Sequence, residues 1–150
     1  MVLNSVMADS IGHEIKSINH ILQRKMLALA NEEGIDKVTV MHGWIMCFLA
    51  DNKDRDIYQK DIESTFSISR STVTNILKLM EEKGYINRVS VDCDARLKKL
   101  ILTQKGEEIN KVIHTTILSN EEKFDKILTD EEKKTFLYLI RKLKKGLENS

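Results

Sequence analysis

Apolar residues recur at helical spacing near the start of the chain. Steps of three and four residues separate them, which places their side chains on one face of a helix of roughly twenty residues. These residues are Ile11, Ile15, Ile18, Leu22, Met26 and Leu29. Gly34 is well placed to end this helix, because glycine commonly follows the last helical turn.

A second helix is predicted from Val38 to Leu49, with a wide apolar face that we expect to be mostly buried. The residues of that face are Met41, Trp44, Ile45, Phe48 and Leu49. The charged run from Asp51 to Asp56 is typical of a solvated turn and closes the helix.

Two shorter helices follow in quick succession. The first is predicted from Gln59 to Phe66, and Ser69 is suited to capping the second, which runs to about Lys83 before Gly84 stops it. One side of the second helix is apolar, with Val73, Ile76, Leu77 and Met80. The opposite side is short, polar and free of carboxylates, with Arg70, Ser71, Thr72, Asn75 and Lys78. That polar side either enters a DNA groove or is merely the solvated face of an amphipathic helix.

After Gly84 the pattern changes from helical to extended. Strands are predicted from Tyr85 to Val91 and from Lys98 to Thr103, with Asp92 to Arg96 as the turn of a hairpin. A helix-turn-helix followed at once by a basic hairpin is typical of a winged helix. We therefore predict a mainly α fold with a small β-hairpin wing.

The helical period returns at Gln104 and continues to about Leu128, with a bend expected near Ser119 and Asn120. Thr129 with Glu132 three residues later fits a capping box, which starts a last amphipathic helix. Its apolar residues are Phe136, Leu139, Ile140, Leu143 and Leu147. Single apolar stripes on residues 11–30 and 105–147 exceed what a small winged helix can bury, so we expect them to meet a second copy of the chain.

Composition supports one helical module. The chain has 150 residues, of which 41% are hydrophobic and 31% charged, and it has no proline. Its net charge is only +1, but residues 66–105 carry 8 Lys/Arg against 4 Asp/Glu, whereas residues 1–65 carry 7 against 10 and residues 106–150 carry 9 against 9. The positive field is therefore gathered over the helix and hairpin that could approach phosphates.

Several function classes are not supported by the sequence. The apolar runs are too short to cross a bilayer, and residues 1–10 lack the basic start and apolar core of a secretory signal. Cys47 and Cys93 show no disulfide or metal spacing, so we expect a reducing, cytoplasmic setting. No phosphate loop, catalytic triad or zinc motif is present, and we expect no enzymatic activity, no cofactor and no metal.

The segment from Asp94 to Gly106 carries the most diagnostic pattern: an Asp, an Arg two residues later, and a strand that ends in Leu-Thr shortly before a Gly. With Ser69 to Thr74 and Leu79 to Tyr85, it resembles the MarR (multiple antibiotic resistance regulator) family of winged helix-turn-helix regulators. The resemblance is close from Val38 to Glu107. It implies a homodimeric regulator of double-stranded DNA whose terminal helices interleave, with Arg96 in the minor groove.

Candidate DNA contacts follow from groove chemistry. A helix fits the major groove, where hydroxyls and amides reach base edges and cations reach guanine or phosphate. The candidates on the recognition helix are Ser69, Arg70, Ser71, Thr72, Thr74, Asn75 and Lys78. Those on the wing are Arg88, Asp94, Arg96, Lys98 and Lys99, with Asp94 expected to orient an arginine rather than to touch DNA.

The expected organisation is a single MarR-like domain, with dimerisation helices at 1–34 and 104–150 around a DNA-binding core at 35–103. A twofold dimer predicts an inverted-repeat operator with half-sites roughly 34 Å apart. The resemblance also implies a repressor released by a small aromatic or phenolic effector. His13, His20, Met41, His42 and Trp44 are the candidate effector ligands, with Met41 and Trp44 more simply explained, taken singly, as core residues. A redox- or metal-responsive regulator, or a winged-helix interaction protein that does not read DNA, remain alternatives.

Overall fold

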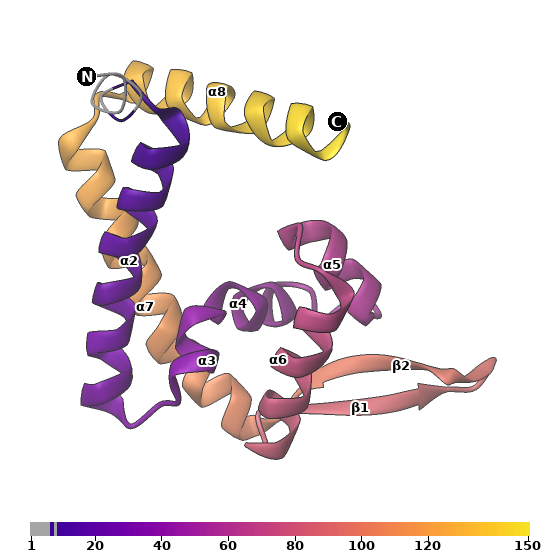
Figure 1. Ribbon diagram of the computed structural model, residues 1–150. Coiled ribbons are helices and arrows are strands. Elements are labelled where there is room, and N and C mark those ends of the chain that lie inside the picture. The colour runs from indigo at the N-terminus through magenta and orange to yellow at the C-terminus, as the bar shows by residue number, and fades with distance from the viewer. Residues whose placement is uncertain (1–6, 8) are drawn as a thin grey trace. The chain divides into compact units, whose positions relative to one another are not determined.

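The computed structural model describes residue 7 and residues 9–150, and the chain forms two compact units, Met1–Ile113 and His114–Ser150. Residues 1–6 and 8 lie outside the described residues. They belong to the predicted dimerisation segment 1–34 and to the N-terminal residues that lack the pattern of a secretory signal. The elements are labelled in Figure 1. They are α2 (Ile11–Glu33), α3 (Lys37–Met41), α4 (Gly43–Asp51), α5 (Gln59–Phe66), α6 (Arg70–Glu82), β1 (Ile86–Val91), β2 (Asp94–Leu102), α7 (Gln104–Ile127) and α8 (Asp130–Glu148). The predicted fold class, mainly helical with one hairpin, is confirmed.

The boundaries predicted for the first long helix are confirmed. Ser10 caps α2 at its start, where its side chain accepts a hydrogen bond from the His13 amide at 3.2 Å. Gly34 ends the helix in the left-handed conformation, with φ 67°, and its N–H donates to the Ala30 carbonyl. No helix of the described residues is both long enough and apolar enough to cross a bilayer.

The single helix predicted from Val38 to Leu49 is wrong. The chain forms α3 and α4 instead, separated by His42 with φ −109° and ψ 28°. A Cβ on Gly43, the first residue of α4, would lie 2.4 Å from Cγ2 of Ile113 in α7. The helical spacing of apolar residues continues on both sides of His42. The pattern therefore could not reveal the helix break, which coincides with the contact between Gly43 and Ile113.

Residues of α4, α5, α6 and β1 contribute to the core of the first unit. Ile45, Ile62, Leu77, Met80 and Ile86 are each at most 1% exposed. Burial of each such side chain contributes about 1.5–3 kcal/mol relative to an exposed position. The predicted apolar side of α6 is confirmed in full, since all four of its residues are buried.

The turn between α5 and α6 is tight. Ser67 adopts φ 52° and ψ 43°, and the Ile68 amide donates to the Glu63 carbonyl at 3.2 Å. Ser69 then caps α6 by accepting from the Thr72 amide at 3.4 Å, as predicted. The start of α6 is thereby fixed against the end of α5.

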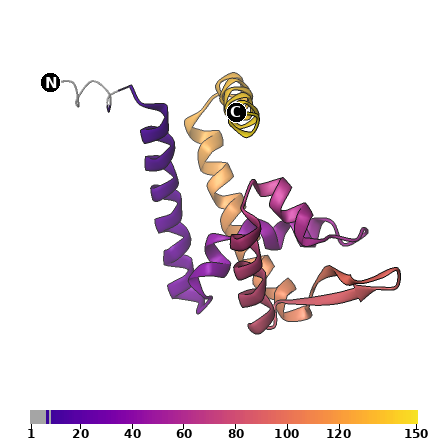
Figure 2. The ribbon, with the colours of Figure 1, turned by 45° about the vertical axis from the view of Figure 1, so that its right-hand side comes forward.

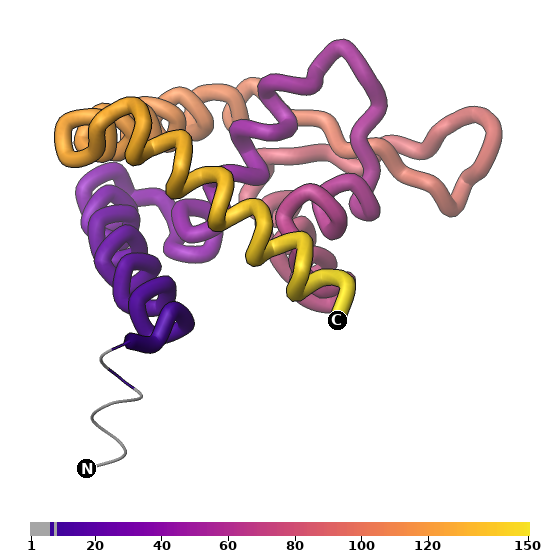
Figure 3. Tube along the Cα trace, turned by 90° about the horizontal axis from the view of Figure 1, so that it is seen from above, coloured from indigo at the N-terminus to yellow at the C-terminus, as the bar shows by residue number. Residues whose placement is uncertain are grey.

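The hairpin is longer than predicted. β1 and β2 pair antiparallel from Ile86↔Leu102 to Ser90↔Lys98, with an irregularity between Ser90 and Val91. The prediction that Asp92 to Arg96 is all turn is wrong, because Asp94 to Arg96 belong to β2. Those three residues look turn-like by composition, yet Asp94 pairs with Val91 of β1, and the irregularity between Ser90 and Val91 accommodates the residues that follow it. Figures 1, 2 and 3 all show the hairpin projecting from the first unit on the side away from α2.

A cluster of contacts joins the end of α6, the hairpin and the start of α7. The Thr103 hydroxyl donates to the Gly84 carbonyl at 2.5 Å and accepts from the Gly106 amide at 3.0 Å. A Cβ on Gly106 would lie 2.0 Å from the Tyr85 carbonyl oxygen, so only glycine fits there. The first turns of α7 are therefore rigidly attached to the wing and to the end of α6.

The second unit holds the end of α7 and all of α8. The capping box predicted at Thr129 and Glu132 is confirmed, with reciprocal bonds of 2.9 and 3.2 Å. α7 continues as one helix through Ser119 and Asn120, where a bend was expected. No residue of α8 is buried, and its large exposed apolar residues are Phe136, Leu137, Tyr138, Leu139, Leu143 and Leu147.

Candidate nucleic-acid interface

The predicted recognition helix presents a polar face. All seven candidate residues from Ser69 to Lys78 are exposed, while Val73, Ile76 and Leu77 between them are buried. Carboxylates occur on α6 only at Glu81 and Glu82, in its last turn. The N-terminal two-thirds of the helix therefore offers hydroxyls, an amide and cations with no negative charge among them.

The hydroxyls on this face differ in the partners they already have. Ser69 Oγ donates to Thr72 Oγ1 at 2.8 Å while it caps the helix. Thr74 Oγ1 donates to the Arg70 carbonyl at 2.8 Å and accepts from Gln59 Nε2, also at 2.8 Å. Ser69 and Thr74 thus have structural bonds that a DNA contact would have to share.

Arg96 is the most prominent cation of the wing. Its side chain is 93% exposed, and the Asp94 carboxylate accepts from its backbone amide at 2.9 Å and from its Nε at 3.5 Å. Asp94 is therefore in position to orient this arginine. A carboxylate that directs an exposed guanidinium outward suits contact with a region of concentrated negative potential.

Two other wing candidates are partly engaged within the chain. Arg88 is only 24% exposed; its Nε lies 3.9 Å from a Glu81 oxygen and has no hydrogen-bond partner. Lys99 Nζ lies 3.6 Å from the Asp56 carboxylate. Both can still contribute charge, but they are less free to reach phosphate than Arg96 or the exposed Lys98.

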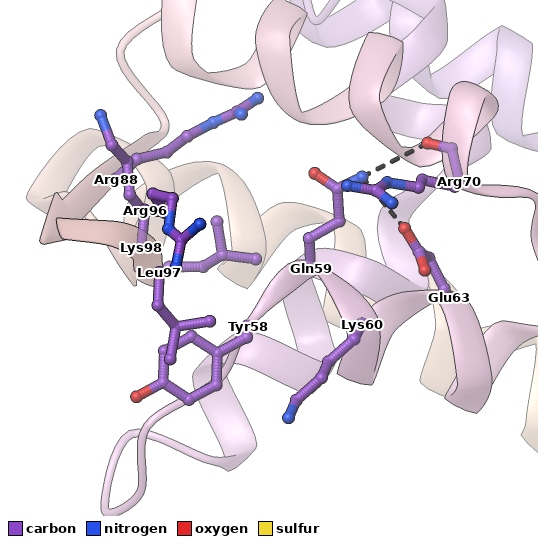
Figure 4. Close-up of a pocket in the computed structure, with 10 residues that line it drawn as sticks. Tyr58, Gln59, Lys60, Glu63, Arg70, Arg88, Arg96, Leu97 and Lys98 are labelled. Carbon is purple, nitrogen blue, oxygen red and sulfur yellow. Dashed lines mark hydrogen bonds between the residues drawn. The ribbon is translucent and has the colours of Figure 1, made fainter. Parts of the chain in front are cut away.

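A cleft of about 360 Å³ lies between the start of α5, the start of α6 and the wing (Figure 4). Its cationic side chains come from four elements, α5, α6, β1 and β2, and Glu63 is the one carboxylate among its lining residues. The lining residues are Tyr58, Gln59, Lys60, Glu63, Arg70, Arg88, Arg96, Leu97, Lys98 and Leu100. An excess of cations in a concave surface concentrates positive potential where a phosphodiester could bind.

The residues that α5 contributes to this cleft were missed by sequence reasoning. Tyr58, Gln59 and Lys60 surround the start of α5, which was predicted only as the partner helix of α6. Desolvation, then the charge of the nearby Asp56, raises the pKa of the Tyr58 phenol. The available signal was a cluster of polar residues at the start of the first helix of the helix-turn-helix. The direction in which these side chains point, however, depends on how α5 packs against α6.

The candidate effector residues are not gathered in one cavity. His13 and His20 line a hollow of about 420 Å³ on α2, together with Lys16, Ser17, Ile21 and Arg24. Met41 and Trp44 do not line it; they are 43% and 54% exposed, so the expectation that their face is mostly buried is wrong for both. His42 lies between α3 and α4, where desolvation lowers its pKa and favours the neutral imidazole.

The two thiols lie in different surroundings. Cys47 is buried, and desolvation together with Asp51 raises its pKa to about 11, so its thiolate is scarce at neutral pH. Cys93 is exposed on the hairpin turn. Within the described part of the chain, no three His, Cys, Asp or Glu residues are arranged to hold a metal ion.

Comparison with known proteins agrees with this geometry. The MarR family model matches residues 36–97, which span α3 through the start of β2. An uncharacterized HTH-type transcriptional regulator of Bacillus subtilis (strain 168), YwoH, is 34% identical over 83 residues; the match covers 55% of this chain and 60% of YwoH.

Solved structures extend the likeness to nearly the whole chain. The transcription regulator MarR from Oenococcus oeni PSU-1 is 26% identical, with a TM-score of 0.75, and the match covers 93% of this chain and 99% of that one. MepR of S. aureus, solved as a DNA complex, has a TM-score of 0.81 at 21% identity, covering 92% of this chain and 98% of MepR. At that identity, the likeness to MepR shows a shared fold.

Proposed function

We propose that this chain is a transcription regulator of the MarR family, a homodimeric repressor which binds operator DNA and is released by a small-molecule effector. The match of a MarR family model to residues 36–97 and the likeness to HTH-type transcriptional regulators support a regulator rather than an enzyme. The proposed DNA contacts are the exposed face of α6 in the major groove and Arg96 of the hairpin in the minor groove. A chromosomal target implies that it acts in the cytoplasm.

The observation that carries the proposal is the convergence of positive charge from α5, α6 and the wing on one cleft. Lys60, Arg70 and Lys98 belong to three different elements and line it together. The solvated face of an amphipathic helix does not require cations from a hairpin and a neighbouring helix to lie beside it. Contacts to consecutive phosphates need this arrangement, because the strand passes all three elements.

The dimer is supported by apolar surface that the described chain leaves uncovered. Ile11, Ile15 and Ile18 on α2 are 62%, 46% and 46% exposed, and α8 carries a longer apolar series. Burying each such side chain fully would contribute about 1.5–3 kcal/mol. Against a second copy, these helices gain a partner, and twofold symmetry gives two α6 helices about one DNA turn apart, roughly 34 Å.

Release by an effector is the least constrained part of the proposal. His13, His20, Met41, His42 and Trp44 remain the proposed ligands, since exposed Met41 and Trp44 offer apolar and aromatic surface and the α2 hollow offers histidines. A ligand that prefers the dimer with badly spaced α6 helices would shift the population away from DNA. An anionic aromatic compound suits this combination of cationic and apolar side chains.

Selection of bound duplexes from a random DNA pool tests the function directly. The full chain should select an inverted repeat whose half-sites are about 10 base pairs apart, and sedimentation should give a dimer. Affinity should fall steeply between about 50 and 200 mM salt if several phosphates are contacted. A chain that fails to bind any duplex at low salt, or that binds with no salt dependence, would contradict the proposal and favour a winged-helix interaction protein.

A further inference from the structure

We propose that Gln59 is a positioning residue that fixes the Thr74 hydroxyl as a hydrogen-bond acceptor, so that Thr74 selects an amino group on a base edge. The inference rests on the proposed function, namely contact between α6 and DNA bases. Gln59 is the first residue of α5, and Thr74 is exposed in the second turn of α6. One side-chain amide therefore bridges the two helices of the helix-turn-helix.

The orientation of the Gln59 amide is determined by its neighbours. Nε2 lies 3.1 Å from Oε1 of Glu63 and 3.3 Å from the Arg70 carbonyl oxygen (Figure 4). A carboxylate and a carbonyl can only accept hydrogen bonds, so the amide nitrogen, not the amide oxygen, faces them. The same nitrogen is therefore the donor in the 2.8 Å contact with Thr74 Oγ1, the shortest of the three.

The Thr74 hydroxyl can consequently only accept, and not donate, a further hydrogen bond. It has one hydrogen and two lone pairs. The hydrogen goes to the Arg70 carbonyl at 2.8 Å, and one lone pair accepts from Gln59. What remains for a ligand is a single lone pair, with no hydrogen to donate.

This polarity restricts what Thr74 can recognise. Phosphate oxygens, guanine N7 and O6, and thymine O4 all need a donor, whereas adenine N6 and cytosine N4 supply one in the major groove. Thr74 therefore favours adenine or cytosine and does not serve as a phosphate contact. Thr72 has the opposite character, because its Oγ1 accepts from Ser69 at 2.8 Å and keeps its own hydrogen for a phosphate or guanine.

Sequence selection with matched variants tests the inference. The wild-type chain should prefer adenine or cytosine at one position of each half-site, and Thr74→Val should reduce that preference about two- to tenfold, the equivalent of one hydrogen bond. Valine keeps the shape and a methyl group, so a thymine preference based on methyl contact would survive the change. Gln59→Ala should also weaken the preference, because without the Gln59 donor the hydroxyl can rotate its hydrogen from the Arg70 carbonyl towards a base acceptor.

The control and the double variant separate the possible causes. Ser64→Ala, which removes an exposed α5 hydroxyl outside the cleft, should leave the preference at the Thr74 position intact. Gln59→Ala with Thr74→Val should be no less selective there than Thr74→Val alone. An unchanged base preference in Thr74→Val, or a wild-type preference for guanine or thymine that Thr74→Val abolishes, overturns the inference while leaving DNA binding in place. A wild-type chain that binds no DNA overturns the proposed function itself.

Discussion

Arg96→Ala should weaken DNA binding strongly while leaving the fold intact. The side chain is 93% exposed and its ion pair with Asp94 is at the surface, so its loss should cost less than about 1 kcal/mol of unfolding free energy. In the complex, a charged hydrogen bond of this kind contributes about 1.5–3 kcal/mol. Two arginines per dimer then give an expected rise in Kd of about a hundredfold or more.

Fluorescence anisotropy with a selected operator duplex, repeated over a salt series, measures both parts of this prediction. If each Arg96 in the minor groove releases about one counterion from the DNA, its loss from both subunits should reduce the slope of log K against log salt by about 1.8. Lys37→Ala, an exposed cation outside the cleft and the recognition helix, is the matched control and should change little. Equal Kd values for Arg96→Ala and the wild type would refute the assignment of the wing.

Substitution of Asp94 tests the same assignment further, because two explanations of its role predict changes in DNA affinity of opposite sign. Removing a negative charge near DNA should tighten binding if Asp94 acts only through its charge. If Asp94 orients Arg96 through the contacts at 2.9 and 3.5 Å, Asp94→Ala should weaken binding, though less than Arg96→Ala does. Tighter binding by Asp94→Ala would show that the orienting contact is dispensable.

Three further predictions concern stability and reactivity. Gly106→Ala should destabilise the fold by about 3 kcal/mol or more, measured by urea unfolding, because its Cβ would fall 2.0 Å from a backbone oxygen; a wild-type midpoint would show that the close approach can relax. Thiol labelling of the native protein near neutral pH should modify Cys93 quickly and Cys47 only on unfolding, since burial raises the pKa of Cys47 to about 11; rapid loss of both thiols would contradict this and support thiol-based sensing. The hydrogen bond from Lys53 lowers the pKa of Glu107 below its ordinary 4.5, so the pair stabilises the fold above that pH, and this contribution is lost as the pH falls through the lowered pKa. The difference in melting temperature between the wild type and Lys53→Met at pH 7 should therefore vanish in acid. A difference that persists in acid would show that the lysine stem stabilises the fold by packing.

The helix ends and the buried side of α6 could be predicted from the sequence alone. The end of α2 at Gly34, the cap at Ser69 and the capping box at Thr129 depend on bonds that span three or four residues. The buried side of α6 depends only on helical period. Such features need no distant partner, which is why apolar spacing and capping chemistry were sufficient to predict them.

Other features were decided by residues far apart in the chain. The break at His42 coincides with the contact of Gly43 on Ile113, and the extension of β2 back to Asp94 is a product of pairing with β1. Gathering the α5 side chains with the wing cations in one cleft, and turning Gln59 onto Thr74, required α5 to pack at one particular angle on α6. Sequence period fixes which side of a helix is polar, but tertiary packing alone determines which polar groups meet, because their bonds join residues that no local spacing relates.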